Sequence, residues 1–150
     1  MAGGTINWQP PAYNPDTGLF YVTEHNTFSI FYLTDPDPRG SMGLGGKLAV
    51  NVGSGGNALA AIDYRTGKKV WRHAWPPGGG GGAGMLTSAG KVLFTGDGNG
   101  NFVAFDATNG KPVWHSRIGN ISNAPQTYLL DGKQVLLVAV GDTLYAFTIY

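Results

Sequence analysis

One eleven-residue pattern occurs twice in the chain and constrains its fold more than any other feature. Residues 104–114 are AFDATNGKPVW and residues 61–71 are AIDYRTGKKVW, so Ala, Asp, Gly, Lys, Val and Trp recur in the same places. The offset is 43 residues, for example from Trp71 to Trp114. A repeat of roughly 40–45 residues that is punctuated by turns and aromatic side chains is typical of propeller blades. The pattern therefore predicts that the chain is built from β-propeller repeats.

Composition agrees with an all-β chain and excludes several classes of function. The 150 residues include 25 glycines, and only 13% are charged, which suits many short strands joined by tight turns. The net charge of +1 gives no electrostatic footprint for nucleic acid. Cysteine is absent, so disulfides and thiol chemistry are excluded. No apolar run reaches the roughly 18 residues of a membrane-spanning helix.

The repeat divides the chain into three expected blades. Blade 1 covers about 5–75 and contains an inserted loop at 26–56, blade 2 covers about 83–118, and blade 3 covers about 122–150. Blade 2 shows the hairpin signals most clearly, because Asp97-Gly98 and Asn109-Gly110 separate its short apolar runs. We expect four, four and three antiparallel strands.

The third blade repeats the second at an offset of 42 residues but lacks the segment that contains the Trp. A propeller needs at least about four blades to close its ring. The fold class expected is therefore all-β, a partial propeller of about three four-stranded blades with the last one incomplete. The remainder of a propeller, or further copies of this chain, are the expected partners. Met1-Ala-Gly-Gly has no basic region followed by an apolar one, so no signal peptide is expected and we expect Met1 to begin a fragment.

The repeated Ala-x-Asp-x-x-x-Gly-x-x-x-Trp pattern resembles the tryptophan-docking motif of quinoprotein propellers, in which the Trp of one blade packs on the Ala and Gly of a neighbouring motif. Further strings extend the similarity: NWQP at 7–10, YNPDTGLFY at 13–21 and GMLTSAG at 84–90. Together they resemble the C-terminal part of the alcohol dehydrogenases that depend on pyrroloquinoline quinone (PQQ). The match covers nearly the whole chain apart from 26–56.

This resemblance implies an eight-bladed propeller that binds PQQ and Ca²⁺ near its axis. The catalytic Asp and the Ca²⁺ ligands of that family lie upstream, so we assign no catalytic and no metal residue here. Asn7 matches an Asn whose amide reaches the quinone, and Trp8 stands beside it. Gly82 occupies the place of a Trp that contacts the quinone in the family, so that contact is absent. The cofactor-binding residues expected are Asn7, Trp8, Gly82 and Gly84.

The resemblance implies a fragment of a periplasmic dehydrogenase that oxidises alcohols or sugars by hydride transfer to PQQ. We expect the 150 residues alone to be inactive, and their binding of PQQ and calcium to be doubtful. The alternative is a non-catalytic propeller repeat protein that serves as a binding or assembly scaffold. No nucleic acid and no transmembrane segment is expected. The Asn7-Trp8 string favours the dehydrogenase, and the Gly at position 82 favours the scaffold.

Other candidate motifs have simpler structural explanations. Asp97-x-Asn99-x-Asn101 has the oxygen spacing of a Ca²⁺ loop, but it lacks the Gly and distal Glu of an EF-hand and is better explained as a hairpin turn. The histidines are too scattered for a zinc site, and His73 and His115 are expected at the surface. The five glycines at 78–82 lack the Lys-Ser/Thr of a phosphate loop and predict a flexible bend. Asp63 and Asp106 are expected to accept hydrogen bonds from turn amides, and Trp71 and Trp114 to pack between blades.

Overall fold

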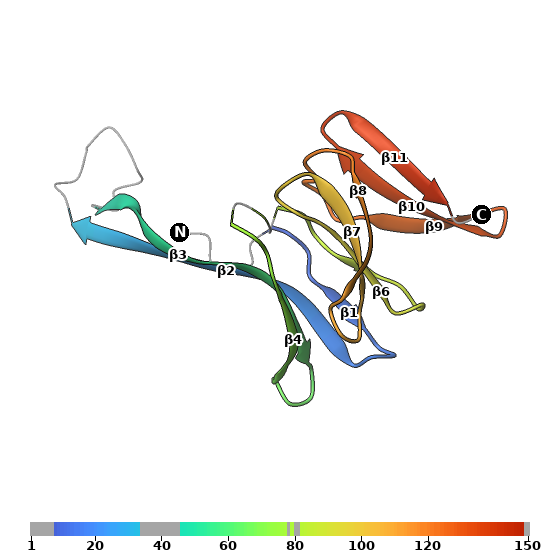
Figure 1. Ribbon diagram of the computed structural model, residues 1–150, viewed down its shortest axis with the longest axis horizontal. Helices are drawn as coiled ribbons and strands as arrows, with labels where there is room; N and C mark the ends of the chain where they lie inside the picture. Colours follow the sequence, from blue (N-terminus) through green and yellow to red (C-terminus); the bar gives the residue numbers. More distant parts are fainter. Residues whose placement is uncertain (1–7, 34–45, 78, 80–81, 149–150) are drawn as a thin grey trace.

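The computed structural model describes residues 8–33, 46–77, 79 and 82–148, which form three antiparallel sheets arranged one after another along the chain (Figure 1). The first sheet has four strands in chain order: β1 (Ala12–Asn14), β2 (Leu19–Leu33), β3 (Gly46–Asp63) and β4 (Lys69–Ala74). Each strand is hydrogen-bonded to the next, so the sheet is a simple meander.

The second and third sheets repeat this topology. The second contains β5 (Leu86–Thr87), β6 (Val92–Gly96), β7 (Asn101–Asp106) and β8 (Pro112–Arg117). The third contains β9 (Gln126–Leu130), β10 (Lys133–Val140) and β11 (Thr143–Thr148), in the order β11-β10-β9. Strand β11 is therefore an edge of its sheet, whereas β7 is covered by β8.

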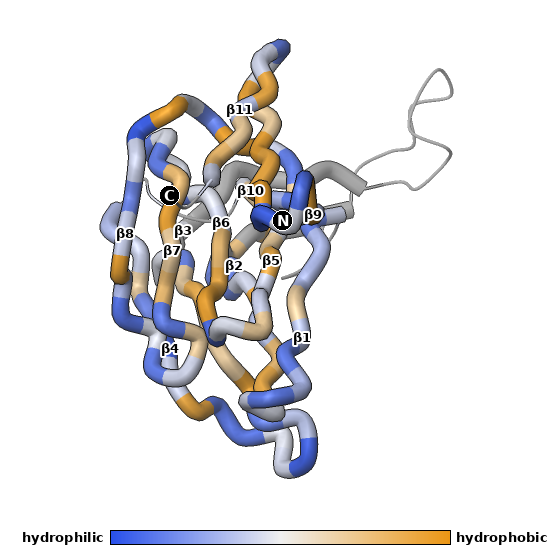
Figure 2. The backbone as a smooth tube through the Cα atoms, turned by 90° about the vertical axis from the view of Figure 1, so that its right-hand side faces the viewer, coloured by the Kyte–Doolittle hydropathy of each residue, from blue (hydrophilic) through white to orange (hydrophobic). Residues whose placement is uncertain are grey.

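The predicted fold class is confirmed. The described residues form two sheets of four strands and one sheet of three strands. These sheets do not close into a ring (Figure 1). Hydrophobic residues, drawn in orange, concentrate along the strands β6, β7, β10 and β11, and the turns between strands are mainly hydrophilic (Figure 2). The described part of the chain contains no helix that is long and apolar enough to cross a membrane. The blade boundaries themselves stay a prediction.

The two Asp-to-Gly turns of the repeat are nearly identical. The Asp63 carboxylate accepts hydrogen bonds from the amides of Arg65 and Thr66, and Gly67 follows with φ +68°. The Asp106 carboxylate accepts bonds from the amide and hydroxyl of Thr108. These bonds hold the pKa of both carboxyls below the ordinary value. The predicted role of Asp63 and Asp106 as acceptors of turn amides is confirmed.

The expected loop at 26–56 is wrong for its described parts. Residues 26–33 and 46–56 continue β2 and β3 as a paired hairpin, with Asn26 opposite Gly56 and Leu33 opposite Gly46. This hairpin arm extends away from the other two sheets (Figure 1). Its pairing is interrupted by irregularities of register between Asn26 and Phe31. Glycines that suggested a loop sit inside the strand instead, and Gly55 places its backbone against the Asn26 side chain.

Trp71 joins the first sheet to the second. Its indole Nε1–H donates to the Ala107 carbonyl at 2.9 Å, and its ring lies over Gly110. A Cβ added at Gly110 would stand 2.5 Å from Trp71 Cε3, so only glycine allows this approach. The surrounding core draws on both sheets, with Tyr21 and Leu59 from the first and Leu93 and Phe105 from the second.

The second and third sheets meet over a separate core. Ile121, Phe102 and Val138 are almost fully buried in it. A Cβ on Gly96 would collide with Ile121 at 2.8 Å, so glycine sets this close approach as well. Trp114 differs from Trp71, because 43% of its surface is exposed although its ring contacts Phe102 and Phe147.

Candidate functional site at the inner ends of the sheets

The segments that lead into the inner strands meet at one place. Strand β1 lies beside β5, and the Asn14 side-chain amide donates to the Thr87 hydroxyl and the Ser88 carbonyl at 2.9 Å each. The Met85 amide donates to the Pro10 carbonyl at 3.0 Å, which ties the segment before β5 to the segment before β1. These two strands each begin their sheet, so the segments that enter the first and second sheets lie together.

Gly84 lies at the centre of this junction. An added Cβ would stand 2.6 Å from Pro10 Cδ and 2.7 Å from Ala124 Cβ, which belong to the segments before β1 and β9. The Gly84 carbonyl accepts a hydrogen bond from the Thr95 hydroxyl at 3.2 Å. The absence of a side chain at Gly84 is therefore used for protein packing in this structure.

The other expected cofactor contacts lie around the junction. Trp8 is 58% exposed, two residues before Pro10. Gly82 is half-buried, and a Cβ there would meet the Ile121 carbonyl at an ordinary contact distance of 3.6 Å. Position 82 thus has room for the first atom of a side chain, unlike position 84. Asn7 lies outside the described residues, so its predicted contact stays a prediction, as do those of Trp8, Gly82 and Gly84.

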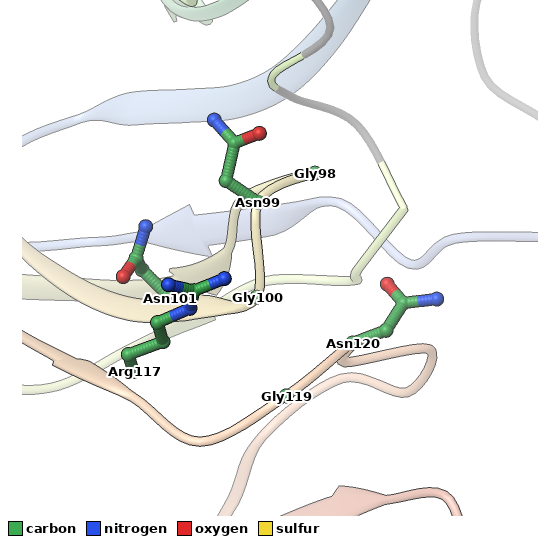
Figure 3. Close-up of a pocket in the computed structure, with 7 residues that line it drawn as sticks. All are labelled: Gly98, Asn99, Gly100, Asn101, Arg117, Gly119 and Asn120. Atoms are coloured by element: carbon green, nitrogen blue, oxygen red, sulfur yellow. The ribbon is translucent and has the colours of Figure 1, made fainter.

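An open basin of about 650 Å³ lies at the β6–β7 turn (Figure 3). It is lined by glycines and polar side chains of the β6–β7 turn and of the segment after β8: Gly98, Asn99, Gly100, Asn101, Arg117, Gly119 and Asn120. Arg117 and Asn101 lie side by side, as their cross-strand register requires, and Asn99 and Asn120 stand at opposite margins of the basin (Figure 3). The polar side chains of the basin are three asparagine amides and the guanidinium of Arg117.

The Asp97 loop beside the basin is a turn. The Asp97 carboxylate accepts the amides of Asn99 and Asn101 at 2.9 and 2.8 Å, and the Asn101 side-chain amide at 2.7 Å. N–H donors therefore occupy the carboxylate oxygens that a Ca²⁺ ion would need. The described residues contain no group of three or more His, Asp or Glu side chains that could hold a metal ion.

Among the described residues, the Glu24 carboxylate is engaged in ion pairs. Glu24 forms ion pairs with Lys69 and with Arg72, whose Nε lies 2.7 Å from Glu24 Oε2. Burial raises the pKa of Glu24, but the hydrogen bonds and charges of the two cations outweigh this effect and leave the pKa below its ordinary value. Glu24 thus links β2 to β4 through two cross-strand ion pairs.

His73 is half-buried, not fully exposed at the surface. Its ring centroid is 4.9 Å from those of Trp75 and Phe105, and burial lowers its pKa. Phe105 belongs to the second sheet, so the contact between sheets covers part of the His73 ring. No signal in the sequence around His73 indicates this contact, whereas His115 is exposed as expected.

An apolar groove between the second and third sheets was not foreseen. Its volume is about 480 Å³, and Phe94, Ala104, Trp114, Leu136 and Phe147 form much of its wall. The exposed part of Trp114 faces this region. The exposure of Trp114 points to the groove, but this exposure is visible only in the structure.

Comparison with known proteins places these features among quinoproteins. Residues 55–149 match the PQQ_2 family model, which is described as outer membrane protein assembly factor BamB. The chain is 37% identical over 147 residues to the quinoprotein ethanol dehydrogenase of Pseudomonas aeruginosa, covering 92% of this chain and 22% of that protein. It therefore spans less than a quarter of that relative.

Solved structures show the same fold. The chain superimposes on a quinohemoprotein alcohol dehydrogenase from Pseudomonas putida with a TM-score of 0.78 and 25% identity, covering 94% of this chain and 23% of the other. It also superimposes on a europium-containing methanol dehydrogenase with a TM-score of 0.73 and 28% identity, covering 90% of this chain and 24% of the other. The suspected resemblance to quinoprotein alcohol dehydrogenases is confirmed.

Proposed function

Because the chain belongs to the PQQ_2 family and resembles part of the quinoprotein alcohol dehydrogenases, we propose that it supplies three blades of a dehydrogenase propeller. The reaction proposed for the complete propeller is the oxidation of an alcohol or sugar by hydride transfer to PQQ. The observation that carries the proposal is the convergence of three entry segments around Gly84, next to the exposed Trp8. In a propeller this convergence lies towards the axis, where ligands bind.

The described residues do not fit a complete site for PQQ with a divalent cation. The space beside the Gly84 backbone is filled by Pro10 and Ala124. The described residues also offer no cluster of acidic side chains that could bind the cation. We therefore derive no catalytic step from this chain. Trp8 and the open position at Gly82 are proposed as one margin of the site, with Asn7 and Gly84 completing it, and further blades supply the rest.

The first experiment concerns the chain alone. Purified chain is given PQQ, Ca²⁺, ethanol and a dye acceptor, and dye reduction is followed. We expect no turnover, because the described residues supply no metal ligands and no base. Steady dye reduction above a matched sample of heat-denatured chain would contradict this part of the proposal.

The second experiment tests the dehydrogenase assignment itself. The chain replaces the corresponding segment of the Pseudomonas aeruginosa ethanol dehydrogenase, and the chimera is assayed with PQQ, Ca²⁺ and dye. We expect alcohol oxidation that falls when Trp8→Ala removes the exposed ring. A folded chimera that binds PQQ normally but never oxidises alcohol would support the alternative.

That alternative is a non-catalytic scaffold. It is favoured by the description of the matching family model as an assembly factor and by glycine at position 82. Replacing Gly82 by Trp in the chimera separates the two possibilities, because a dehydrogenase lacking only this contact should bind PQQ more tightly when a ring is restored.

We also propose a periplasmic location, by similarity to the quinoprotein dehydrogenases, which fractionation of the source cells would test.

A further inference from the structure

The sequence contains two Asn-Gly pairs, and both lie in turns of the second sheet. Asn99-Gly100 connects β6 to β7, and Asn109-Gly110 connects β7 to β8. In an Asn-Gly pair the glycine nitrogen can attack the asparagine carboxamide with little hindrance, because glycine has no Cβ. Both asparagines are exposed to solvent. Local sequence and exposure therefore do not distinguish the two pairs.

Hydrogen bonds hold the Asn109 side chain at both ends. Its Nδ2 donates to Asp106 Oδ2 at 2.7 Å, and its Oδ1 accepts the Lys111 amide at 2.9 Å. The Gly110 amide donates to the Asp106 carbonyl at 2.8 Å. The attacking nitrogen and the carboxamide that it would attack are thus both engaged elsewhere, and the bond to the carboxylate is charge-assisted.

The Asn99 side chain is not held in this way. The Asn99 backbone amide donates to the Asp97 carboxylate, but the side chain forms no hydrogen bond with another described residue. The Gly100 amide has only a long contact of 3.4 Å with the Asp97 carbonyl. The Asn99 carboxamide projects from the turn and meets no other labelled side chain of the basin (Figure 3). Asn99 therefore keeps the rotational freedom that Asn109 lacks.

We propose that Asn99 is a site of spontaneous deamidation in the folded chain. The Gly100 nitrogen bonds to Asn99 Cγ, the Cγ–Nδ2 bond breaks, and the proton of the Gly100 amide ends on the ammonia that leaves. Water then opens the five-membered imide ring at one of its two carbonyls. The product is aspartate, or isoaspartate if the main chain afterwards runs through the former side chain. Water is the only co-reactant, and neither an oxidant nor a cofactor takes part.

The modification would change the basin in two ways. Arg117 carries the only charge among the residues that line the basin, so a carboxylate at position 99 would offset it. Isoaspartate would also lengthen the main chain between the amides of Asn99 and Asn101, which the Asp97 carboxylate accepts. Deamidation would therefore alter both the charge of the basin and the turn that forms part of its wall.

The test compares the two pairs within one peptide. The full chain is incubated at mildly alkaline pH, either folded or unfolded in guanidinium chloride, and is then digested with trypsin. Residues 92–117 are released together, because Pro112 prevents cleavage after Lys111. Fragmentation in the mass spectrometer assigns the mass increase to residue 99 or residue 109. The unfolded chain gives the intrinsic rate of each pair.

We expect folding to slow the reaction at Asn109 at least about tenfold more than at Asn99, a factor of the size expected for one charge-assisted hydrogen bond. Equal protection of the two pairs would overturn the proposal. So would a folded chain that stays unmodified at residue 99 while the unfolded chain reacts there.

Two variants locate the reaction and its cause. Asn99→Gln keeps a carboxamide but disfavours closure of the ring, so the mass increase of the folded chain should be lost; its persistence would contradict the assignment. Asp106→Ala removes the acceptor of Asn109 Nδ2 and should speed the reaction at Asn109 in the folded chain. An unchanged rate there would contradict the role given to the hydrogen bond. The experiment uses no quinone, so its failure is distinct from failure of the proposed function.

Discussion

At the scale of single residues, glycine at position 110 controls how closely two sheets approach. Gly110→Ala places a Cβ 2.5 Å from the Trp71 ring and also requires Ala at φ +73°. We expect a loss of about 2–4 kcal/mol in the free energy of unfolding, from overpacking together with backbone strain. Urea unfolding followed by tryptophan fluorescence measures this change.

Gly67→Ala is the control for that prediction, because Gly67 has almost the same φ but no atom within 4 Å. The free energy of unfolding of Gly67→Ala should therefore fall only by the cost of a positive φ for alanine, about 1 kcal/mol. Equal losses in the two variants would mean that the contact with Trp71 contributes nothing beyond the glycine backbone.

We expect His73 to make the stability of the chain depend on pH. Burial lowers its pKa, so the unfolded state binds a proton at a higher pH than the folded state does. The stabilisation is fully present above the ordinary pKa of about 6.5 and is lost as the pH falls below it towards the lowered value. We expect His73→Phe, which keeps a ring against Trp75 and Phe105, to weaken the dependence of the unfolding midpoint on pH in this window. His115→Gln provides the control, since it removes an imidazole from an exposed position.

At the scale of elements, local chemistry predicted the turns well and predicted long-range contacts poorly. The hairpins around Asp97-Gly98 and Asn109-Gly110 follow from short-range sequence, and the structure places them between β6, β7 and β8. The hairpin arm was missed because Gly53, Gly55 and Gly56 suggest a loop, and their strand character depends on pairing with β2. The burial of His73 was missed for a similar reason, since Phe105 approaches it from another sheet. The expected cofactor contacts at Trp8, Gly82 and Gly84 stay predictions, and the packing of Pro10 and Ala124 around Gly84 could not be read from sequence.

The hairpin arm should be removable without loss of the first sheet. Deleting residues 27–55 joins Asn26 to Gly56 and leaves an Asn-Gly loop closed by the pair His25 and Asn57. Asn-Gly is a preferred two-residue hairpin loop, and the exposed Phe28 and Ile30 contribute little to the core. We expect the unfolding free energy to change by less than about 1 kcal/mol, as urea titration would show. A chain that no longer unfolds cooperatively would show that the arm is needed for the fold.

At the scale of the whole molecule, the three sheets differ in how well their surfaces are covered. The first two share the core around Trp71, but the third has an open edge at β11 and exposed Tyr128, Leu130 and Leu144. Local unfolding is easiest where few apolar contacts hold an element and an edge strand lacks a neighbour. The arrangement predicts that amide hydrogens of β9 and β11 exchange before those of β6 and β7.

Hydrogen exchange followed by mass spectrometry measures this order directly, and the Trp71→Phe variant tests its cause. Weakening the joint between the first two sheets should speed exchange in β6 and β7 towards the rate of the third sheet. Strands β9 and β11 should change little, because the third sheet contacts the second through a separate core that contains Ile121 and Val138. Equal protection of all three sheets in the native chain would show that the exposed face of the third sheet is stabilised by other means. In a complete propeller the same strands should become protected, since a further strand would pair with the open edge of β11.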